Sequence, residues 1–372
     1  MLRRPNLSRR MTGGRYLPEV DGLRFFCIVP VVLAHLAISV AQDAGGQRTF
    51  LARLLSSGSF GVEFFFLISG FILTAPFIRA RRDGTKVPLG SYYLRRLTRL
   101  EPPYLVALLL IGGAWAISNG GLGANIGHLA AGTVYGHGLL YEGYNPLFTI
   151  GWSLEIEVQF YVLLPLVASI FRLPPLVRRS LLAASVVAAS VSPQAFSRQP
   201  YTVWQFWQFF AVGMLLADLF VTEWRSDPRP VRWLWPAGLV MPVVLGWLVY
   251  TNPGDNVGAV LIPWVALAVA GLAFLSAPWR RLLTVPAVSI AGGMCYSIYL
   301  LHQRVIDAVH PLASRILPAM SFPAAMVATA ILVLPVVAVV ATTFFVLVER
   351  PCMVPRWPIL LWRRRREALA AA

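Results

Sequence analysis

Long apolar stretches separated by short polar segments run through the whole sequence. About 20 consecutive apolar residues cross the hydrocarbon core of a bilayer as a helix, and the chain offers about ten such stretches. The predicted spans are 24–43, 60–79, 101–118, 153–172, 179–193, 203–221, 233–250, 258–277, 286–309 and 325–347. The pattern therefore predicts an all-α fold, a polytopic transmembrane helical bundle.

Basic residues are unevenly distributed among the segments that join these spans. An even number of spans puts alternate loops and both termini on one side, and most arginines fall there, including those at 79–99. The opposite side holds the loop 119–150, which has no Lys or Arg and is expected to form a partly embedded cap. Cytoplasmic loops are enriched in Lys and Arg, so both termini are predicted to be cytoplasmic. We expect a basic cytoplasmic arm at 1–23, one transmembrane domain at 24–350 and a basic cytoplasmic tail at 351–372.

The composition agrees with a lipid environment. Only 13% of the 372 residues are charged and 57% are hydrophobic, whereas soluble domains carry about 25% charged residues. The net charge of +16 comes from short Lys and Arg clusters between apolar runs, which argues against a nucleic-acid partner. Cys27, Cys295 and Cys352 lack metal-ligand or disulfide spacing, so no metal is expected. The Ala, Arg and Gly bias indicates a high-GC bacterium, and we expect a multi-pass protein of the inner (plasma) membrane.

The first span carries two ionisable residues, which mark functional sites because they are costly inside a bilayer. Arg24 and His35 are eleven positions apart, about three helical turns or about 16 Å of rise, and share nearly one face. Arg24 is therefore expected near the cytoplasmic mouth and His35 near the midplane. A neutral histidine at that depth accepts a proton, as a general base must. The alternative is a histidine that only hydrogen-bonds a neighbouring helix.

The second span begins with the segment GVEFFFLISGF. Its Ser69-Gly70 pair is typical of close helix packing; the alternative is that Ser69 contacts the donor substrate. Glu63, two turns away near the outer end, is predicted to face an acceptor or to be an interfacial carboxylate.

The segment SYYLRRLTRLEPPY, residues 91–104, places Arg96 and Arg99 three positions apart on one helix face. Two guanidinium groups on one face favour phosphate recognition at the cytoplasmic entrance. The alternative is that they only set membrane topology. Tyr93 belongs to the same predicted donor site.

A polar stripe enters the membrane in the segment GWSLEIEVQFYVLLPL, where Ser153, Glu157 and Tyr161 follow one another at four-residue spacing. An embedded carboxylate must be protonated or paired, so Glu157 is expected to pair with an Arg or His, or to hold an acceptor hydroxyl. We group it with Arg24 and His35 as catalytic.

Several further residues are predicted to support an acceptor. Trp152 precedes the polar stripe, and Tyr299 and His302 lie three apart on one face near the outer end of the ninth span. With Glu63, Ser153 and Tyr161 they form the predicted acceptor group. Glu349, by contrast, is expected to make a structural ion pair where the tenth span meets the cytoplasmic surface.

Together these segments resemble the membrane acyltransferase-3 family. Six short motifs of that family appear in order along most of the chain. They are a basic residue and a histidine with ten residues between them (Arg24, His35), G-V-[DE]-x-F-F-x-x-S-G-F (61–71), R-x-x-R before a proline (96–102), W-S-L-x-x-E-x-x-F-Y (152–161), Y-S-x-Y-L-x-H (296–302) and E-[RK]-P (349–351).

The resemblance implies an enzyme that moves an acyl group, commonly acetyl, from cytoplasmic acyl-CoA to a hydroxyl of a glycan, glycolipid or macrolide-type antibiotic. It implies that His35 is the catalytic base, Arg24 its partner, and Arg96 with Arg99 the contacts to the CoA phosphates. The chain departs from the family pattern at Glu63, where many members have Asp, and at Val158, where many have Glu.

Three other functions predict different features in the sequence. A transporter or flippase of a lipid-linked saccharide predicts an internal repeat with broken helices, and no repeat is seen. A glycosyltransferase predicts several acidic residues in the loop 119–150, which has only Glu142. A purely structural scaffold leaves the aligned Arg24 and His35 unexplained.

Overall fold

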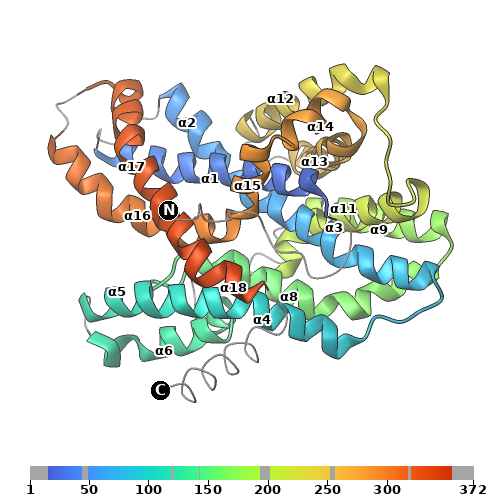
Figure 1. The fold of residues 1–372 in the computed structure, drawn as a ribbon, viewed down its shortest axis with the longest axis horizontal. Coiled ribbons are helices and arrows are strands. Elements are labelled where there is room, and N and C mark those ends of the chain that lie inside the picture. The colour runs from blue at the N-terminus through green and yellow to red at the C-terminus, as the bar shows by residue number, and fades with distance from the viewer. Residues whose placement is uncertain are drawn as a thin grey trace, which may run out of the picture.

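A computed structural model describes residues 16–43, 49–118, 121–141, 143–192, 202–251, 256–316 and 320–353. These residues form helices joined by short turns, with no strand among them (Figure 1). The helices are α1 (Pro18–Asp43), α2 (Phe50–Ser56), α3 (Gly61–Arg82), α4 (Leu89–Ala107), α5 (Gly113–Ser118), α6 (Gly121–Thr133), α7 (His137–Leu140), α8 (Gly151–Val167), α9 (Pro175–Val191), α11 (Trp207–Asp218), α12 (Trp235–Thr251), α13 (Asn256–Leu275), α14 (Ala277–Leu283), α15 (Pro286–Gly293), α16 (Cys295–Ile316), α17 (Phe322–Phe344) and α18 (Arg350–Cys352). The predicted all-α fold is confirmed. The predicted arm and tail fall mostly outside the described residues.

Within the described ranges, eight helical segments are long and apolar enough to cross a membrane, each matching a predicted span. They are 18–43, 50–82, 89–118, 151–172, 203–223, 232–251, 257–275 and 322–352. The chain is therefore a polytopic membrane protein. The predicted fifth span corresponds to α9, which has 17 residues. The predicted ninth divides at Met294 into α15 and α16, and α16 carries the charged residues Arg304, Asp307 and Arg315.

Two predicted boundaries were wrong. The third span does not begin at Pro102, because α4 starts at Leu89 and runs through both prolines into a π-helical turn at Leu108–Gly112 that joins it to α5. The loop 119–150 is not all loop: α6 occupies its first half and packs against α5 (Figure 1).

Helices α3 and α11 cross at the centre of the bundle, where two glycines allow close contact. A Cβ on Gly70 would collide with the carbonyl of Phe210, and one on Gly213 with the carbonyl of Leu67. Small residues let transmembrane helices approach closely, since packing rather than hydrophobic burial joins them. The helix-packing interpretation of Gly70 is therefore correct.

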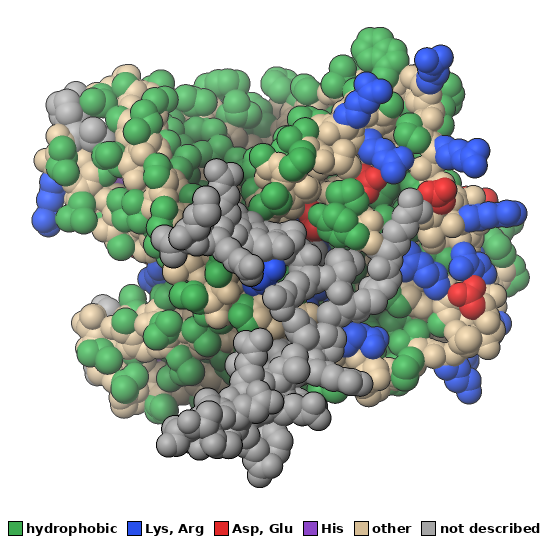
Figure 2. All heavy atoms as spheres, viewed as in Figure 1, with side chains coloured by type: hydrophobic (Ala, Val, Ile, Leu, Met, Phe, Trp, Pro, Cys, Tyr) green, Lys and Arg blue, Asp and Glu red, His purple; other side chains and the backbone are tan. Residues whose placement is uncertain are grey.

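Charged residues gather toward one end of the bundle. Figure 2 shows an apolar surface over most of one face, with most Lys and Arg near the end where α3 terminates (right in the view). Arg79, Arg81 and Arg82 lie in the last turn of α3. By the positive-inside rule this is the expected cytoplasmic end.

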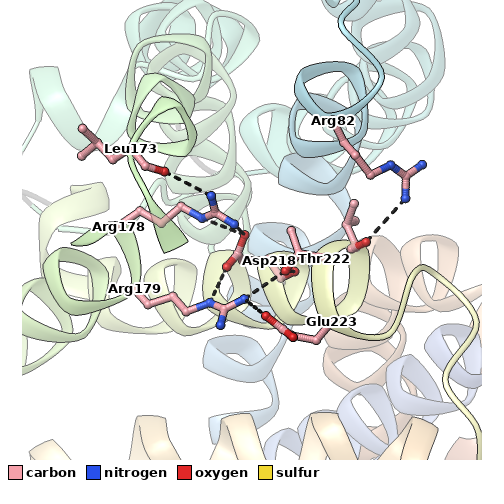
Figure 3. Close-up of polar contacts among 8 residues, drawn as sticks. Arg82, Leu173, Arg178, Arg179, Asp218, Thr222 and Glu223 are labelled. Carbon is pink, nitrogen blue, oxygen red and sulfur yellow. Dashed lines mark hydrogen bonds and ion pairs between the residues drawn. The ribbon is translucent and has the colours of Figure 1, made fainter. Parts of the chain in front are cut away.

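Two arginines near the start of α9, Arg178 and Arg179, face a buried carboxylate (Figure 3). The Asp218 carboxylate on α11 is fully buried and receives Arg178 Nη2 at 2.6 Å and Arg179 Nε at 2.6 Å. Arg179 also donates to Glu223 Oε1 at 2.6 Å and Thr222 Oγ1 at 2.9 Å. The network joins α9 to α11 because two guanidinium groups share one carboxylate.

Replacing this carboxylate is expected to weaken the bundle. Asp218→Asn removes the negative charge beside Arg178 and leaves a buried guanidinium without compensation, which costs on the order of 3–5 kcal/mol. A clear fall in the melting temperature of the detergent-solubilised protein is expected. Asp227→Asn, in the nearby turn after α11, serves as the control. Equal melting temperatures for the two variants would contradict the structural role of Asp218.

Candidate active site

A narrow cavity of about 110 Å³ lies in the core between α1, α3, α4, α8 and α16. Six of the thirteen site residues predicted from the sequence line it: Arg24, Ser69, Arg99, Ser153, Glu157 and Tyr299. The polar lining residues are Arg24, Ser69, Arg99, Ser153, Glu157, Tyr296, Tyr299 and Glu349, with Cys295 beside them. Five helices distant in sequence thus bring guanidinium, carboxyl and hydroxyl groups to one place.

The predicted polar stripe of α8 faces this cavity. Ser69 on α3 donates to Glu157 Oε1 at 2.5 Å, and the Tyr161 hydroxyl hydrogen-bonds the same carboxyl group. Ser153 Oγ lies 2.6 Å from the Tyr299 hydroxyl, which also donates to the Ile150 carbonyl at 3.0 Å. Glu157 was expected to pair with an Arg or His, or to hold an acceptor hydroxyl; the groups that hydrogen-bond it here are the hydroxyls of Ser69 and Tyr161. These contacts hold α3, α8 and α16 around the cavity.

Arg24 points into the cavity and is oriented from its own helix. Its Nη1 donates to Asp21 Oδ1 at 2.7 Å, and the Asp21 side chain is only 2% exposed. Eleven residues of helix place His35 about 16 Å further along α1. The structure therefore pairs Arg24 with Asp21 within α1, a partner that was not predicted although Asp21 lies one turn away in the sequence.

His35 meets a second histidine instead. Its Nδ1 lies 2.8 Å from Nε2 of His302 on α16, and the His302 ring has no exposed surface. His302 Nδ1 lies 2.8 Å from the Tyr299 carbonyl and 3.1 Å from that of Ile298. The contact between helices that was considered as the alternative for His35 is thus present.

These contacts define the tautomers when both rings are neutral. A carbonyl only accepts, so His302 Nδ1 carries the proton and its Nε2 accepts from His35 Nδ1. His35 Nε2 is then left with its lone pair available. The His35 side chain is half-buried and lies outside the cavity lining, but the Tyr299 ring, which lines the cavity, has its centroid 5.8 Å from that of His302. The histidine pair therefore lies one residue layer beyond the cavity.

The two arginines of α4 have different surroundings. Arg99 lines the cavity, as a donor contact at its mouth would. Arg96 lies between two tyrosine rings, with its guanidinium carbon 5.7 Å from the centroid of Tyr92 and 5.8 Å from that of Tyr161. Its Nε is buried with no hydrogen-bond partner among the described residues. The Tyr93 hydroxyl donates to the Val162 carbonyl at 3.4 Å, so it too joins α4 to α8.

Two predicted acceptor residues, Trp152 and Glu63, do not line this cavity, and Trp152 packs against an aromatic wall formed by Phe66 and Phe206. The Trp152 ring packs on Phe66 and Phe206, at centroid distances of 6.3 and 5.4 Å. Glu63 lines a separate cavity beyond Phe206 rather than the one that Ser69 lines.

Glu349 was not predicted as a site residue, yet it lines the cavity. It is 2% exposed and accepts from the Ser297 backbone N–H at 3.1 Å and from Ser297 Oγ at 2.5 Å. The E-R-P motif signalled this position. Only the fold shows that the π-helical turn at the end of α17 directs the carboxyl group inward.

A second histidine pair joins α6 and α7, in the segment between α5 and α8. His128 Nδ1 is 3.0 Å from His137 Nε2, and both rings pack on Tyr141. Burial lowers the pKa of His137, and the neighbouring His128 lowers it further. No group of three or more His, Cys, Asp and Glu in the described ranges is arranged to hold a metal ion.

The known proteins to which this chain is similar are named as acyltransferases or O-acetyltransferases. An acyltransferase MdmB of Streptomyces mycarofaciens is 29% identical over 395 residues, which covers 95% of each chain. A Staphylococcus aureus (strain COL) protein named as a candidate O-acetyltransferase is 26% identical over 326 residues, 80% of this chain and 52% of the relative. The O-acetyltransferase OatA of S. aureus (strain NCTC 8325) is 32% identical over 169 residues, 42% of this chain and 26% of OatA. This chain thus spans about half the length of the staphylococcal relative from strain COL. No solved structure matches.

The model of an acyltransferase domain family matches residues 17–348, a range that contains every predicted site residue. The chain belongs to the membrane acyltransferase-3 family.

Proposed function

We propose that this chain is an integral-membrane O-acyltransferase that moves a short acyl group, acetyl first among the candidates, from cytoplasmic acyl-CoA to a hydroxyl of a glycan, glycolipid or macrolide-type acceptor. The names of the relatives support acyl transfer to oxygen. The observation that carries the proposal is the His35–His302 hydrogen bond directly beyond a cavity lined by Arg24 and Arg99.

The donor is proposed to enter from the basic end of the bundle. Arg24 and Arg99 both line the cavity, and guanidinium groups suit phosphate recognition. The pantetheine arm would then run along α1 toward His35, over the rise of about 16 Å between Arg24 and His35. Ser69, Tyr93 and Arg96 remain predicted donor contacts around this path.

His35 is proposed as the general base. Its Nε2 lone pair takes the proton of the acceptor hydroxyl while the oxygen attacks the thioester carbonyl. The C–S bond then breaks, and the leaving CoA thiolate takes the proton from the His35 imidazolium, which restores the neutral base. His302 accepts from His35 Nδ1, which keeps Nε2 unprotonated before the reaction and stabilises the imidazolium formed during it.

The remaining polar residues are proposed to shape the pocket. Glu157, held by Ser69 and Tyr161, places a carboxyl group opposite Arg24. Ser153 and Tyr299 offer hydroxyl groups at the end near the histidine pair. The cavity volume of about 110 Å³ is small, since one water alone needs about 10–15 Å³ by the same measure. The volume therefore favours a short acyl chain.

Removing the base tests the proposal directly. His35→Ala is expected to reduce acyl transfer from radiolabelled acetyl-CoA to host envelope glycolipids by at least about 100-fold, the usual contribution of a general base. The variant should elute as a monodisperse peak in detergent. Transfer at the natural rate would exclude His35 as the base.

His302 is proposed as a positioning residue, which the conservative variant distinguishes from a merely structural one. His302→Leu removes the acceptor for His35 Nδ1 and is expected to lower kcat about 100-fold with an unchanged KM for the donor. His302→Gln restores an acceptor and is expected to recover most of kcat. Equal losses in both variants would contradict the role.

The donor site is tested by titration with CoA in a calorimeter, without an acceptor. Arg99→Ala is expected to raise the Kd for CoA about 10-fold or more, since a charge-assisted hydrogen bond contributes about 1.5–3 kcal/mol. Arg95→Ala, which removes an exposed arginine from the same helix, is the matched control. Similar Kd values for both variants would remove Arg99 from the phosphate site.

A further inference from the structure

A second, larger cavity of about 400 Å³ lies behind the aromatic wall, among α3, α9, α11, α12 and α13. Three phenylalanines, Phe60, Phe206 and Phe209, line it together with Glu63 and other polar side chains. Its lining shares no residue with that of the first cavity, the one lined by Arg24, Arg99 and Glu157, which we call the reaction cavity.

Three polar atoms in this second cavity are buried and have no hydrogen-bond partner among the described residues. They are Glu63 Oε2, Ser190 Oγ and Gln208 Oε1, and Ser190 is only 2% exposed. Buried polar groups are nearly always hydrogen-bonded, so three unpaired atoms around one space indicate a missing partner. A carboxylate oxygen and an amide oxygen only accept, so that partner must donate, as the hydroxyls of a saccharide do.

A third cavity, of about 330 Å³ and largely apolar, adjoins the second. The two share Ser57, Phe60 and Val249 in their linings. The apolar cavity runs beside α1 from Leu23 to Pro30, a helical rise of about 10 Å. Its dimensions and lining suit an aliphatic chain.

The apolar cavity reaches the outside of the bundle at α12. Gly246 lines it and is exposed, on a helix whose only buried residues are Gly238 and Leu245. A Cβ built on Gly246 meets no heavy atom within 4 Å. A lipid chain therefore has an open side through which to enter from the bilayer.

We propose that these adjoining cavities form one site for an amphiphile, a glycolipid whose hydroxylated head occupies the polar cavity and whose chain occupies the apolar one. The head would lie beside the reaction cavity, since Phe66 lines that cavity and its ring centroid is 5.2 Å from that of Phe206. That this glycolipid is the acyl acceptor rests on the proposed function; the binding itself does not.

Octyl β-D-glucopyranoside is a probe with both parts of the ligand. Native mass spectrometry of the full chain in a polyoxyethylene detergent, which has no sugar, measures its Kd without donor or turnover. Methyl β-D-glucopyranoside lacks the chain and octanol lacks the head, so each is expected to bind at least 10-fold more weakly. Octanol binding as tightly as the glucoside would overturn the proposal.

Variants locate the binding. Gly246→Leu adds a side chain at the open side of the apolar cavity, where a Cβ meets no heavy atom within 4 Å, and is expected to raise the Kd at least 10-fold, whereas Gly113→Leu, also at an open helix position, is the matched control. The double variant Ser190→Ala/Gln208→Met removes two unpaired polar atoms and is expected to weaken the glucoside about 10-fold but not octanol. Affinity unchanged in both variants would overturn the site.

One further variant separates this site from the proposed chemistry. His35→Ala is expected to bind the glucoside with natural affinity, because His35 lines neither cavity. Loss of transfer with retained binding supports the site. Loss of binding in His35→Ala would contradict its independence from the histidine pair.

Discussion

A bilayer offers no hydrogen-bond partners, so each polar group inside this bundle depends on another part of the protein. That constraint explains the contacts that organise the core. Arg178 and Arg179 reach Asp218 from a neighbouring helix, Ser69 donates to Glu157 across two helices, and His35 meets His302. Each of these contacts joins segments far apart in sequence. The polar residues thus fix which helices are neighbours, while small residues fix how closely they approach.

The same constraint gives the histidine pair its direction. His302 donates its Nδ1 proton to a backbone carbonyl of its own helix. Only one combination of tautomers is then possible for the neutral pair. The lone pair at the end of the chain of contacts belongs to His35. An isolated histidine at that depth would have two tautomers available, and only one of them has Nε2 free to accept.

The sequence was a good guide to which residues matter and a poorer guide to their partners. Hydropathy predicted the apolar helices well because length and composition decide membrane insertion. It also predicted a short fifth span, which corresponds to α9, but it could not predict that Met294 would divide the ninth span, since that depends on packing. Residues such as Glu157 stand out because ionisable groups are rare inside spans.

Pairing across helices is where prediction failed. Four-residue spacing places Ser153, Glu157 and Tyr161 on one face, but no local pattern says that Ser69 lies opposite. Arg24 and His35 do share a stripe, yet the rise between them gives each a different partner. The motif identified Glu349, but the sequence predicted it at the cytoplasmic surface, whereas its side chain is buried. The π-helical turn that directs it inward depends on tertiary contacts rather than on composition.

Satisfied and unsatisfied polar groups also distinguish the two proposed substrate regions. In the reaction cavity, carboxyl and hydroxyl groups hold one another, which suits a site that must keep its geometry while a thin donor passes. In the larger cavity, Glu63, Ser190 and Gln208 each present an atom with no partner in the described part of the chain. Such buried atoms need water held in the cavity or a ligand with hydroxyl groups, since an unpaired polar group in an apolar surrounding is costly. Under the proposals, the donor enters from the basic end and the acceptor from the lipid-facing side of the bundle. The aromatic wall of Phe66 and Phe206 is the place where the two regions adjoin.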